Sequence, residues 1–197
     1  MKCYLYIIRP LDRIFHDSSV FLLQNKISQN KIEKTFNEDP YYYFANESKL
    51  DRKGIIGFVN LGNVFKNDNW LFYPFCSYIH NEYRGNKLGL LMYLSAIDII
   101  SKCLEYSNKL PKLAQHTVIE PDLGPISESA SYIYDALVRR EYISKIEKIN
   151  GGNVYKINKY PNINTYSDPG VYKLIIGSYY EVSHKPILVS NYKLRAA

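Results

Sequence analysis

The stretch YRGNKLG, residues 83–89, combines two cations with two glycines. Arg84 and Lys87 supply positive charge, while Gly85 and Gly89 let a backbone approach a ligand closely and adopt unusual dihedral angles. A β-rich run precedes the stretch and an apolar helical pattern follows it. The first N–H groups of such a helix lack intrahelical partners, and with the helix dipole they favour a pyrophosphate. The alternative interpretation is a plain glycine-containing turn with solvated charges.

The elements before this turn are predicted from β-propensity and from the turn-forming residues between apolar runs. Strands are expected over residues 3–9, 41–46, 54–62 and 70–79. Asp17 and Ser18 can cap a helix that runs to about Asn37. Pro74 falls inside the last strand, and because proline cannot donate to a ladder, we expect a bulge or a splayed strand there.

The elements after the turn begin with a mostly buried helix, because its polar residues form a single stripe. The stripe consists of Ser95, Asp98, Lys102 and Glu105. A short strand is expected over residues 116–120, and Ser127 can cap the next helix. One apolar face of that helix follows the i, i+3, i+4, i+7, i+8 pattern. Its members are Ala130, Ile133, Tyr134, Leu137 and Val138.

The last part of the chain is predicted to be β-structure. Two alternating runs flank residues 150–152, Asn-Gly-Gly, which predicts a hairpin. Further strands are expected within residues 171–177 and 185–190. We expect one main domain over residues 1–158 and an extension over 159–197 that packs on the same domain.

Composition indicates a globular, reduced protein. The chain has 197 residues, of which 46% are hydrophobic and 22% charged, which suits one packed domain. Its three cysteines, Cys3, Cys76 and Cys103, are widely spaced, which disfavours a metal site or a disulfide framework. The most apolar stretch, residues 88–100, contains Asp98 and is too short for a membrane span.

Charge and residue usage give weaker indications. The net charge of +6 is compatible with an anionic ligand, an acidic protein or nucleic acid, although the cations are spread along the chain as on a solvated basic surface. The many tyrosine, lysine, asparagine and isoleucine codons suggest an AT-rich source, such as a phage or an AT-rich bacterium. We expect a cytoplasmic protein, in the host cytoplasm if the source is viral.

The order of elements and two motifs resemble the GCN5-related N-acetyltransferase (GNAT) family. That family carries Arg/Gln-x-x-Gly-x-Gly/Ala after its fourth strand. Here IHNEYRGNKLG, residues 79–89, places Arg84 first and Gly89 last. Lys87 stands where the first signature glycine belongs, and Asn81 replaces a usual proline.

The second family element is Asn-x-x-Ala-x-x-x-Tyr-x-x-x-Gly-Phe. Residues 127–142 keep Ala130 and Tyr134, whereas Ser127 replaces the asparagine. The final Gly-Phe is stretched into Arg-Glu-Tyr at residues 140–142. The resemblance covers roughly residues 1–158 and implies an α/β domain of the α+β type, with a mixed, mostly antiparallel sheet flanked by helices.

The resemblance implies acetyl-coenzyme A as co-substrate. The turn would hold its pyrophosphate, and the main chain at residues 78–80 would pair with the pantetheine arm. The Lys87 side chain would either crowd the phosphates or pair with them. The implied binding residues are Tyr78, Ile79, His80, Arg84, Gly85, Asn86, Lys87, Leu88, Gly89, Leu90 and Ser127.

The resemblance also implies two catalytic roles. Tyr134 would protonate the leaving thiolate, although a tyrosine on an apolar helix face can equally be a core residue. Glu120 is the expected general base, and its neighbour Asp122 is an alternative, as are His80 and His116. Each can also be a hydrogen-bonded surface residue, and attack through water or by a neutral amine needs no base.

The expected reaction is acetyl transfer to a primary amine by direct attack in a ternary complex, with the carbonyl polarised by N–H groups of the fourth strand. The acceptor could be a small molecule, a protein or a nucleobase, and the residues 159–197 could shape its site or a homodimer contact. The rival is a non-catalytic binding or structural protein on the same fold. A basic nucleic-acid binder is a third interpretation, but the chain lacks its standard motifs.

Overall fold

A computed structural model describes residues 4–10, 18–23, 54–66, 68–102, 110–161, 172–174, 180–183 and 187–188. The strands are β1 (Tyr4–Pro10), β2 (Ser18–Leu23), β3 (Ile55–Lys66), β4 (Asn69–Ile79), β5 (Lys112–Ala114), β6 (Ile143–Ile149), β7 (Gly152–Ile157), β8 (Tyr172–Leu174), β9 (Tyr180–Ser183) and β10 (Ile187–Leu188). The helices are α4 (Leu88–Lys102) and α5 (Glu128–Arg139), with short 3-10 turns η1 (Asn81–Tyr83), η3 (His116–Val118) and η4 (Pro121–Leu123). None of the helices within these ranges is long and apolar enough to cross a membrane.

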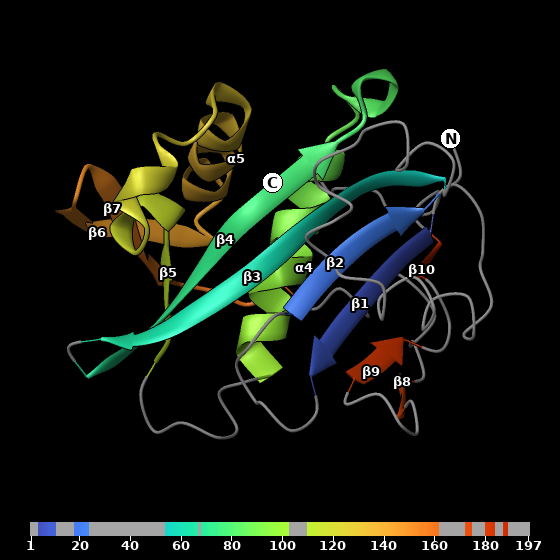
Figure 1. Ribbon diagram of the computed structural model, residues 1–197, viewed down its shortest axis with the longest axis horizontal. Coiled ribbons are helices and arrows are strands. Elements are labelled where there is room, and N and C mark those ends of the chain that lie inside the picture. The colour runs from blue at the N-terminus through green and yellow to red at the C-terminus, as the bar shows by residue number, and fades with distance from the viewer. Residues whose placement is uncertain are drawn as a thin grey trace.

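The described strands form one mixed, mostly antiparallel sheet. Its order is β6-β7-β5-β4-β3-β2-β1-β9-β8, and β10 pairs with β1. Of the pairings among these strands only β4–β5 is parallel, and α4 provides the crossover between its two strands. Figure 1 shows α4 behind the sheet and α5 beside the β5–β7 end. The α+β fold class expected from the sequence is therefore confirmed.

Helix α4 forms the centre of the larger hydrophobic core. Its apolar residues pack with Tyr134 and Leu137 of α5 and with Tyr155 and Ile157 of β7. The predicted polar stripe is buried where the structure describes its side chains. Ser95 is fully buried and its hydroxyl donates to the Leu91 carbonyl at 2.9 Å, and Asp98 is only 4% exposed.

A smaller apolar cluster lies on the other face of the sheet. It contains Leu71 and Tyr73 of β4, whereas Phe72 belongs to the α4 core. Successive residues of a strand point to opposite faces, so the two clusters are separated by the sheet. Ala114, Val118 and Val154 complete the smaller cluster.

Three local predictions are confirmed. Asn60 pairs with Cys76 and Leu61 pairs with Pro74, so Phe75 is the extra residue of a bulge in β4 beside the proline. The β6–β7 hairpin turns at Asn150 and Gly151, which both have positive φ. Helix α5 begins at the predicted cap, where the Ser127 hydroxyl accepts from the Ala130 N–H at 3.2 Å.

The helix predicted from Ser18 is wrong at its start. Residues 18–23 form β2, which is paired on both sides, with β1 and with β3. The serine that fits a cap also fits a strand start, and the pairing with distant strands overrides the local signal. The remainder of that expected helix and the strand at residues 41–46 lie outside the described residues.

The strand predicted over residues 116–120 is also wrong, because the strand ends at Ala114. Gln115 still donates its N–H to the Asn153 carbonyl at 3.0 Å, but its side-chain Oε1 accepts the Asn153 N–H at 2.8 Å. The side chain thus takes the place of the main-chain carbonyl in the ladder. The chain then leaves the sheet through η3 and η4.

Candidate functional site

Strands β4 and β5 pair only briefly before they diverge. Leu71 pairs with Lys112 and Phe72 with Leu113, after which β5 ends at Ala114 while β4 continues to Ile79. Figure 1 shows the two strands separating from this point. Beyond Phe72, no described strand pairs with β4 on its β5 side. The C-terminal part of β4 therefore has one edge that no described strand covers.

Main-chain alternation identifies which groups lie on this edge. The His80 N–H donates to the Ile56 carbonyl at 2.8 Å, so His80 faces β3. In an antiparallel ladder alternate residues face alternate sides, so the main-chain groups of Ser77 and Ile79 face the divergence and those of Tyr78 face β3. Of the three strand residues predicted to bind, Ile79 alone presents its main chain to the divergence; Ser77 was not predicted.

Residues 84–87, called here the cationic turn, connect β4 and η1 to α4. All four are exposed. The Arg84 Nε donates to the Ile79 carbonyl at 3.0 Å, which fixes the arginine stem against the end of β4. The Asn86 amide donates to the carbonyls of Tyr83 and Arg84 at 3.2 and 3.4 Å and cross-links the turn.

The first turn of α4 leaves main-chain donors for a ligand. The Leu91 N–H is the first to donate within the helix, to the Lys87 carbonyl at 3.1 Å. The N–H groups of Leu88, Gly89 and Leu90 precede it and have no intrahelical acceptor. The side chains of Leu88 and Leu90 are buried, so only their main chain can serve the turn.

Lys87 adopts a glycine conformation. Its φ is 59°, in the left-handed region, and Gly85, two residues earlier, has φ of 80°. A non-glycine residue there costs about 1–2 kcal/mol. The backbone at position 87 has a conformation that favours glycine, and the chain bears the conformational cost of a lysine there.

Gly89 has a different role from the one its sequence position suggested. It has no positive φ, so the expectation of unusual dihedral angles holds at Gly85 and is wrong at Gly89. A Cβ at Gly89 would lie 2.8 Å from the Cδ1 of Ile133 in α5. The missing side chain is thus explained by the close packing of α5 against the start of α4.

Tyr134 lies on the β5 side of the divergence within a cluster of three aromatic rings, called here the tyrosine cluster: Tyr93, Tyr134 and Tyr155. The Tyr134 ring stacks on Tyr155 at 5.1 Å and meets Tyr93 edge-on at 5.7 Å. Its hydroxyl donates to the Ala114 carbonyl at 3.3 Å, and the residue is 3% exposed. Since the Gln115 N–H faces β7, the Ala114 carbonyl faces β4, and the Tyr134 hydroxyl therefore lies at the point of divergence.

Burial controls the ionisation of this tyrosine. Desolvation raises the pKa of Tyr134 well above its ordinary value of 10.0, and the neighbouring Tyr93 and Tyr155 raise it further. The phenol consequently stays protonated through the neutral range. It can donate a hydrogen bond or a proton, and it cannot act as a base there.

The second phenol of the cluster, that of Tyr93, contacts a side chain of β4. The Tyr93 and Ser77 hydroxyls lie 3.2 Å apart. Burial raises the pKa of Tyr93, so this phenol is also neutral. On the other side of Tyr134, the Tyr155 hydroxyl accepts from the Gln115 Nε2 at 3.2 Å and the Asn153 Nδ2 at 3.3 Å. Residue spacing in the sequence did not identify Ser77, Tyr155 or Gln115 as part of the site, because their contacts join different elements.

The candidate base Glu120 lies on the opposite face of the sheet from Tyr134. Its Oε1 accepts from the Tyr73 hydroxyl at 3.1 Å, and Tyr73 belongs to the smaller cluster. The Tyr73 ring lies over Gly62, where a Cβ would approach the ring to 2.7 Å. The carboxylate is half-buried, so it remains open to a further partner.

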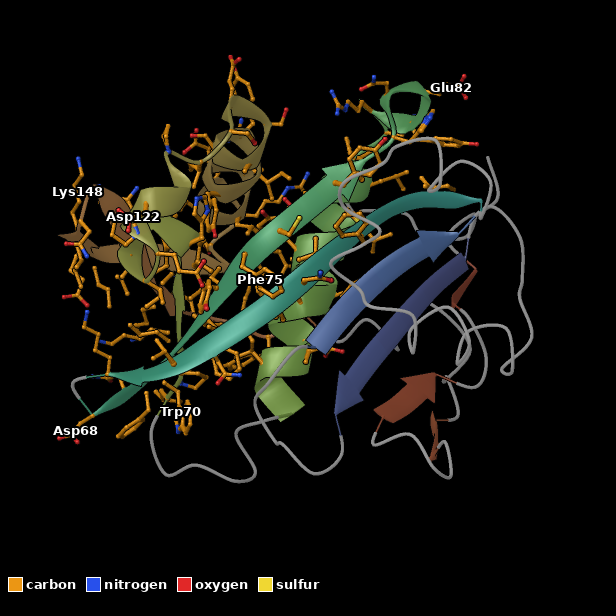
Figure 2. All side chains as sticks on the ribbon, in the orientation of Figure 1. Asp68, Trp70, Phe75, Glu82, Asp122 and Lys148 are labelled. Atoms are coloured by element: carbon orange, nitrogen blue, oxygen red, sulfur yellow. The ribbon has the colours of Figure 1, made fainter. Side chains whose placement is uncertain are left out.

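The other base candidates lie elsewhere. The His116 Nε2 lies 3.0 Å from the Gly124 carbonyl, and the His80 Nδ1 accepts from the Glu82 N–H at 3.4 Å. Asp122 is exposed and lies in front of the β5–β7 end, far across the molecule from Glu82 beside the cationic turn (Figure 2). Ser127, predicted to bind coenzyme, caps α5 and keeps its hydroxyl proton available.

Comparisons with known proteins give a limited result. No protein-family model and no curated protein matches the sequence. Among the solved structures that match is AtaTR, crystallised with bound AcCoA, with a TM-score of 0.44 and 12% identity, covering 74% of this chain and 69% of that chain. This is a distant likeness of fold.

Proposed function

We propose that this protein is an acyl-coenzyme A-dependent N-acetyltransferase of the GNAT type that transfers acetyl to a primary amine. The observation that supports it most is the divergence of β4 and β5. A free strand edge and a cationic turn lie along one strand, and a protonated, buried phenol lies at the end of the other.

The chain supplies donors that suit acetyl-coenzyme A. The unpaired N–H groups at the start of α4, with Arg84 and Lys87, suit a pyrophosphate. The main-chain groups of Ser77 and the N–H of Ile79 suit the amides of an extended pantetheine arm, which would bind as an additional strand does, whereas the Ile79 carbonyl already accepts from Arg84. When bound, the co-substrate would supply a thioester whose acyl carbon accepts an amine and whose sulfur leaves as a thiolate.

Two side chains would manage the protons. Glu120 would accept the proton that the amine loses on acylation, and Tyr73 holds its carboxylate in place. Tyr134 would turn its single hydroxyl proton from the Ala114 carbonyl to the departing sulfur and stabilise it. The raised pKa makes full proton transfer to a thiolate of pKa about 8.5 unfavourable, so the hydrogen bond carries most of the effect.

The first experiment is calorimetric titration of the protein with acetyl-coenzyme A. We expect binding that weakens in Arg84→Gln and is unchanged in Arg139→Gln, which removes an equally exposed arginine from the end of α5. A wild-type protein that does not bind the coenzyme would contradict the proposal.

The second experiment decides between an enzyme and a binding protein. A panel of small amines, peptides and nucleosides is incubated with acetyl-coenzyme A, and acetylated products are sought by mass spectrometry. Coenzyme binding without release of free thiol over any acceptor would favour the non-catalytic interpretation.

A further inference from the structure

Helices α4 and α5 meet through two consecutive contacts. Gly89 and Tyr93 lie one turn apart on the same face of α4. Gly89 faces Ile133, and Tyr93 meets the ring of Tyr134. The cationic turn and the tyrosine are therefore linked by one helical turn and one close interhelical contact.

The close contact leaves no room for a side chain at position 89 unless the terminal methyl of Ile133 or helix α5 moves. A Cβ at position 89 would lie 2.8 Å from the Ile133 Cδ1 and 3.6 Å from its Cγ1. The first distance is too short for two carbon atoms, and the second is ordinary contact. Only one methyl group of Ile133 thus conflicts with a side chain at position 89.

A shift of α5 that moves Ile133 would also move the adjacent Tyr134. Ile133 packs against the large core, and Tyr134 follows it on the same helix. The Tyr134 hydroxyl donates to the Ala114 carbonyl at 3.3 Å, which is longer than the usual O–H···O hydrogen bond. A small shift of α5 away from α4 would break this bond and move the phenol from the end of β5.

We propose that Gly89 is a positioning residue that sets Tyr134 at a fixed distance from the cationic turn by admitting Ile133 against the first turn of α4. This inference rests on the proposed function. It differs from the simpler explanation, in which Gly89 exists so that a phosphate can approach the helix N-terminus.

The two explanations are separated by a rescue experiment. Gly89→Ala introduces the Cβ, and Ile133→Val removes the Cδ1 but keeps a methyl at the Cγ1 position. Alanine is a better helix former than glycine, so Gly89→Ala should fold. The coenzyme dissociation constant and the turnover number are measured for the wild type, both single variants and the double variant.

We expect Gly89→Ala to bind coenzyme within about twofold of the wild type while turnover falls about tenfold, since small misplacements of a reacting group are costly. Ile133→Val should restore most of that turnover in the double variant. Wild-type turnover in Gly89→Ala, or a loss of coenzyme affinity that Ile133→Val leaves uncorrected, would overturn the inference. Failure of the wild type to bind coenzyme would instead overturn the proposed function.

Discussion

The cationic turn and the tyrosine cluster lie at the two sides of the same strand divergence, yet they are built in opposite ways. The turn is exposed, contains two left-handed residues and is held by side-chain bonds from Arg84 and Asn86 to the carbonyls of residues 79, 83 and 84. The tyrosine cluster is buried and held by ring packing and by bonds to Ser77 of β4, Ala114 of β5 and Gln115, which follows β5.

The difference follows from the chemistry proposed for each side. An anion site needs unpaired donors and solvated cations, which contribute little to folding. A proton donor needs a neutral phenol in a fixed place, which burial provides. Substitutions in the turn should therefore change affinity more than stability, and substitutions in the cluster should change turnover and stability together.

The largest effect is expected for Tyr134→Phe. The ring keeps its stacking, but the hydrogen bond that stabilises the departing sulfur is lost, so turnover should fall by about 10²–10³ with coenzyme affinity nearly unchanged. The matched control is Tyr132→Phe on the same helix, whose exposed hydroxyl donates to Glu128 at 2.8 Å. Steady-state kinetics with an active acceptor measures both, and equal turnover in the two variants would make Tyr134 a core residue.

Two substitutions at Lys87 separate charge from backbone strain. Lys87→Ala and Lys87→Gly both remove the ammonium, and if it pairs with phosphate both should weaken coenzyme binding by roughly 1–3 kcal/mol. Only glycine relieves the left-handed conformation, so only Lys87→Gly should raise the unfolding free energy, by about 1 kcal/mol. Calorimetry and urea unfolding give the two quantities. Tighter binding in Lys87→Gly would mean that the lysine blocks the site, and unchanged affinity in both that it points into solvent.

The buried phenols predict a loss of stability in alkali. The pKa of Tyr134 is raised in the folded state, so above pH about 10 the unfolded chain loses a proton that the folded chain retains. The unfolded state then binds fewer protons, and stability falls with rising pH by up to about 1.4 kcal/mol per pH unit for each such group. Below that pH this contribution is complete. Urea unfolding between pH 8 and 11 should show a shallower alkaline decline for Tyr134→Phe than for the wild type, and identical slopes would contradict the burial of the hydroxyl.

The smallest effect is expected at the start of α5. Ser127→Ala removes the hydroxyl that caps the Ala130 N–H and should cost about 1 kcal/mol of unfolding free energy. Ser129→Ala is the control, because Ser129 is exposed in the first turn and is not the cap. A coenzyme affinity that falls in Ser127→Ala would indicate that this serine also contacts the ligand, as the sequence predicted.

Local signals predicted the parts of the fold that local chemistry determines. The Ser127 cap, the Asn-Gly hairpin and the bulge beside Pro74 each depend on residues within a few positions. Residues 18–23 and 116–120 were predicted incorrectly because distant partners decide them. The pairing of β2 with two strands and the Gln115 side chain in the ladder leave no local pattern.

The candidate site shows the same limit. Arg84, Lys87 and Tyr134 were identified from the two motifs, and their binding and catalytic roles stay predictions. The partners that orient Tyr134 were not identified, since Tyr93, Tyr155 and Ala114 come from three other elements. The dihedral angle of Gly89 was misjudged because the residue that explains this glycine, Ile133, lies on another helix.

The short pairing of β4 with β5 has a mechanical consequence. Two residue pairs are all that join the β5–β7 strands to the rest of the described sheet. These strands and α5 come from one continuous stretch, residues 112–157. We expect this stretch to open locally more readily than the long ladder, although its apolar side chains also pack against α4 in the larger core. Amide hydrogen exchange should therefore be faster in β5 than in the long β3–β4 ladder, and a bound molecule that spans β4 and β5 should slow it.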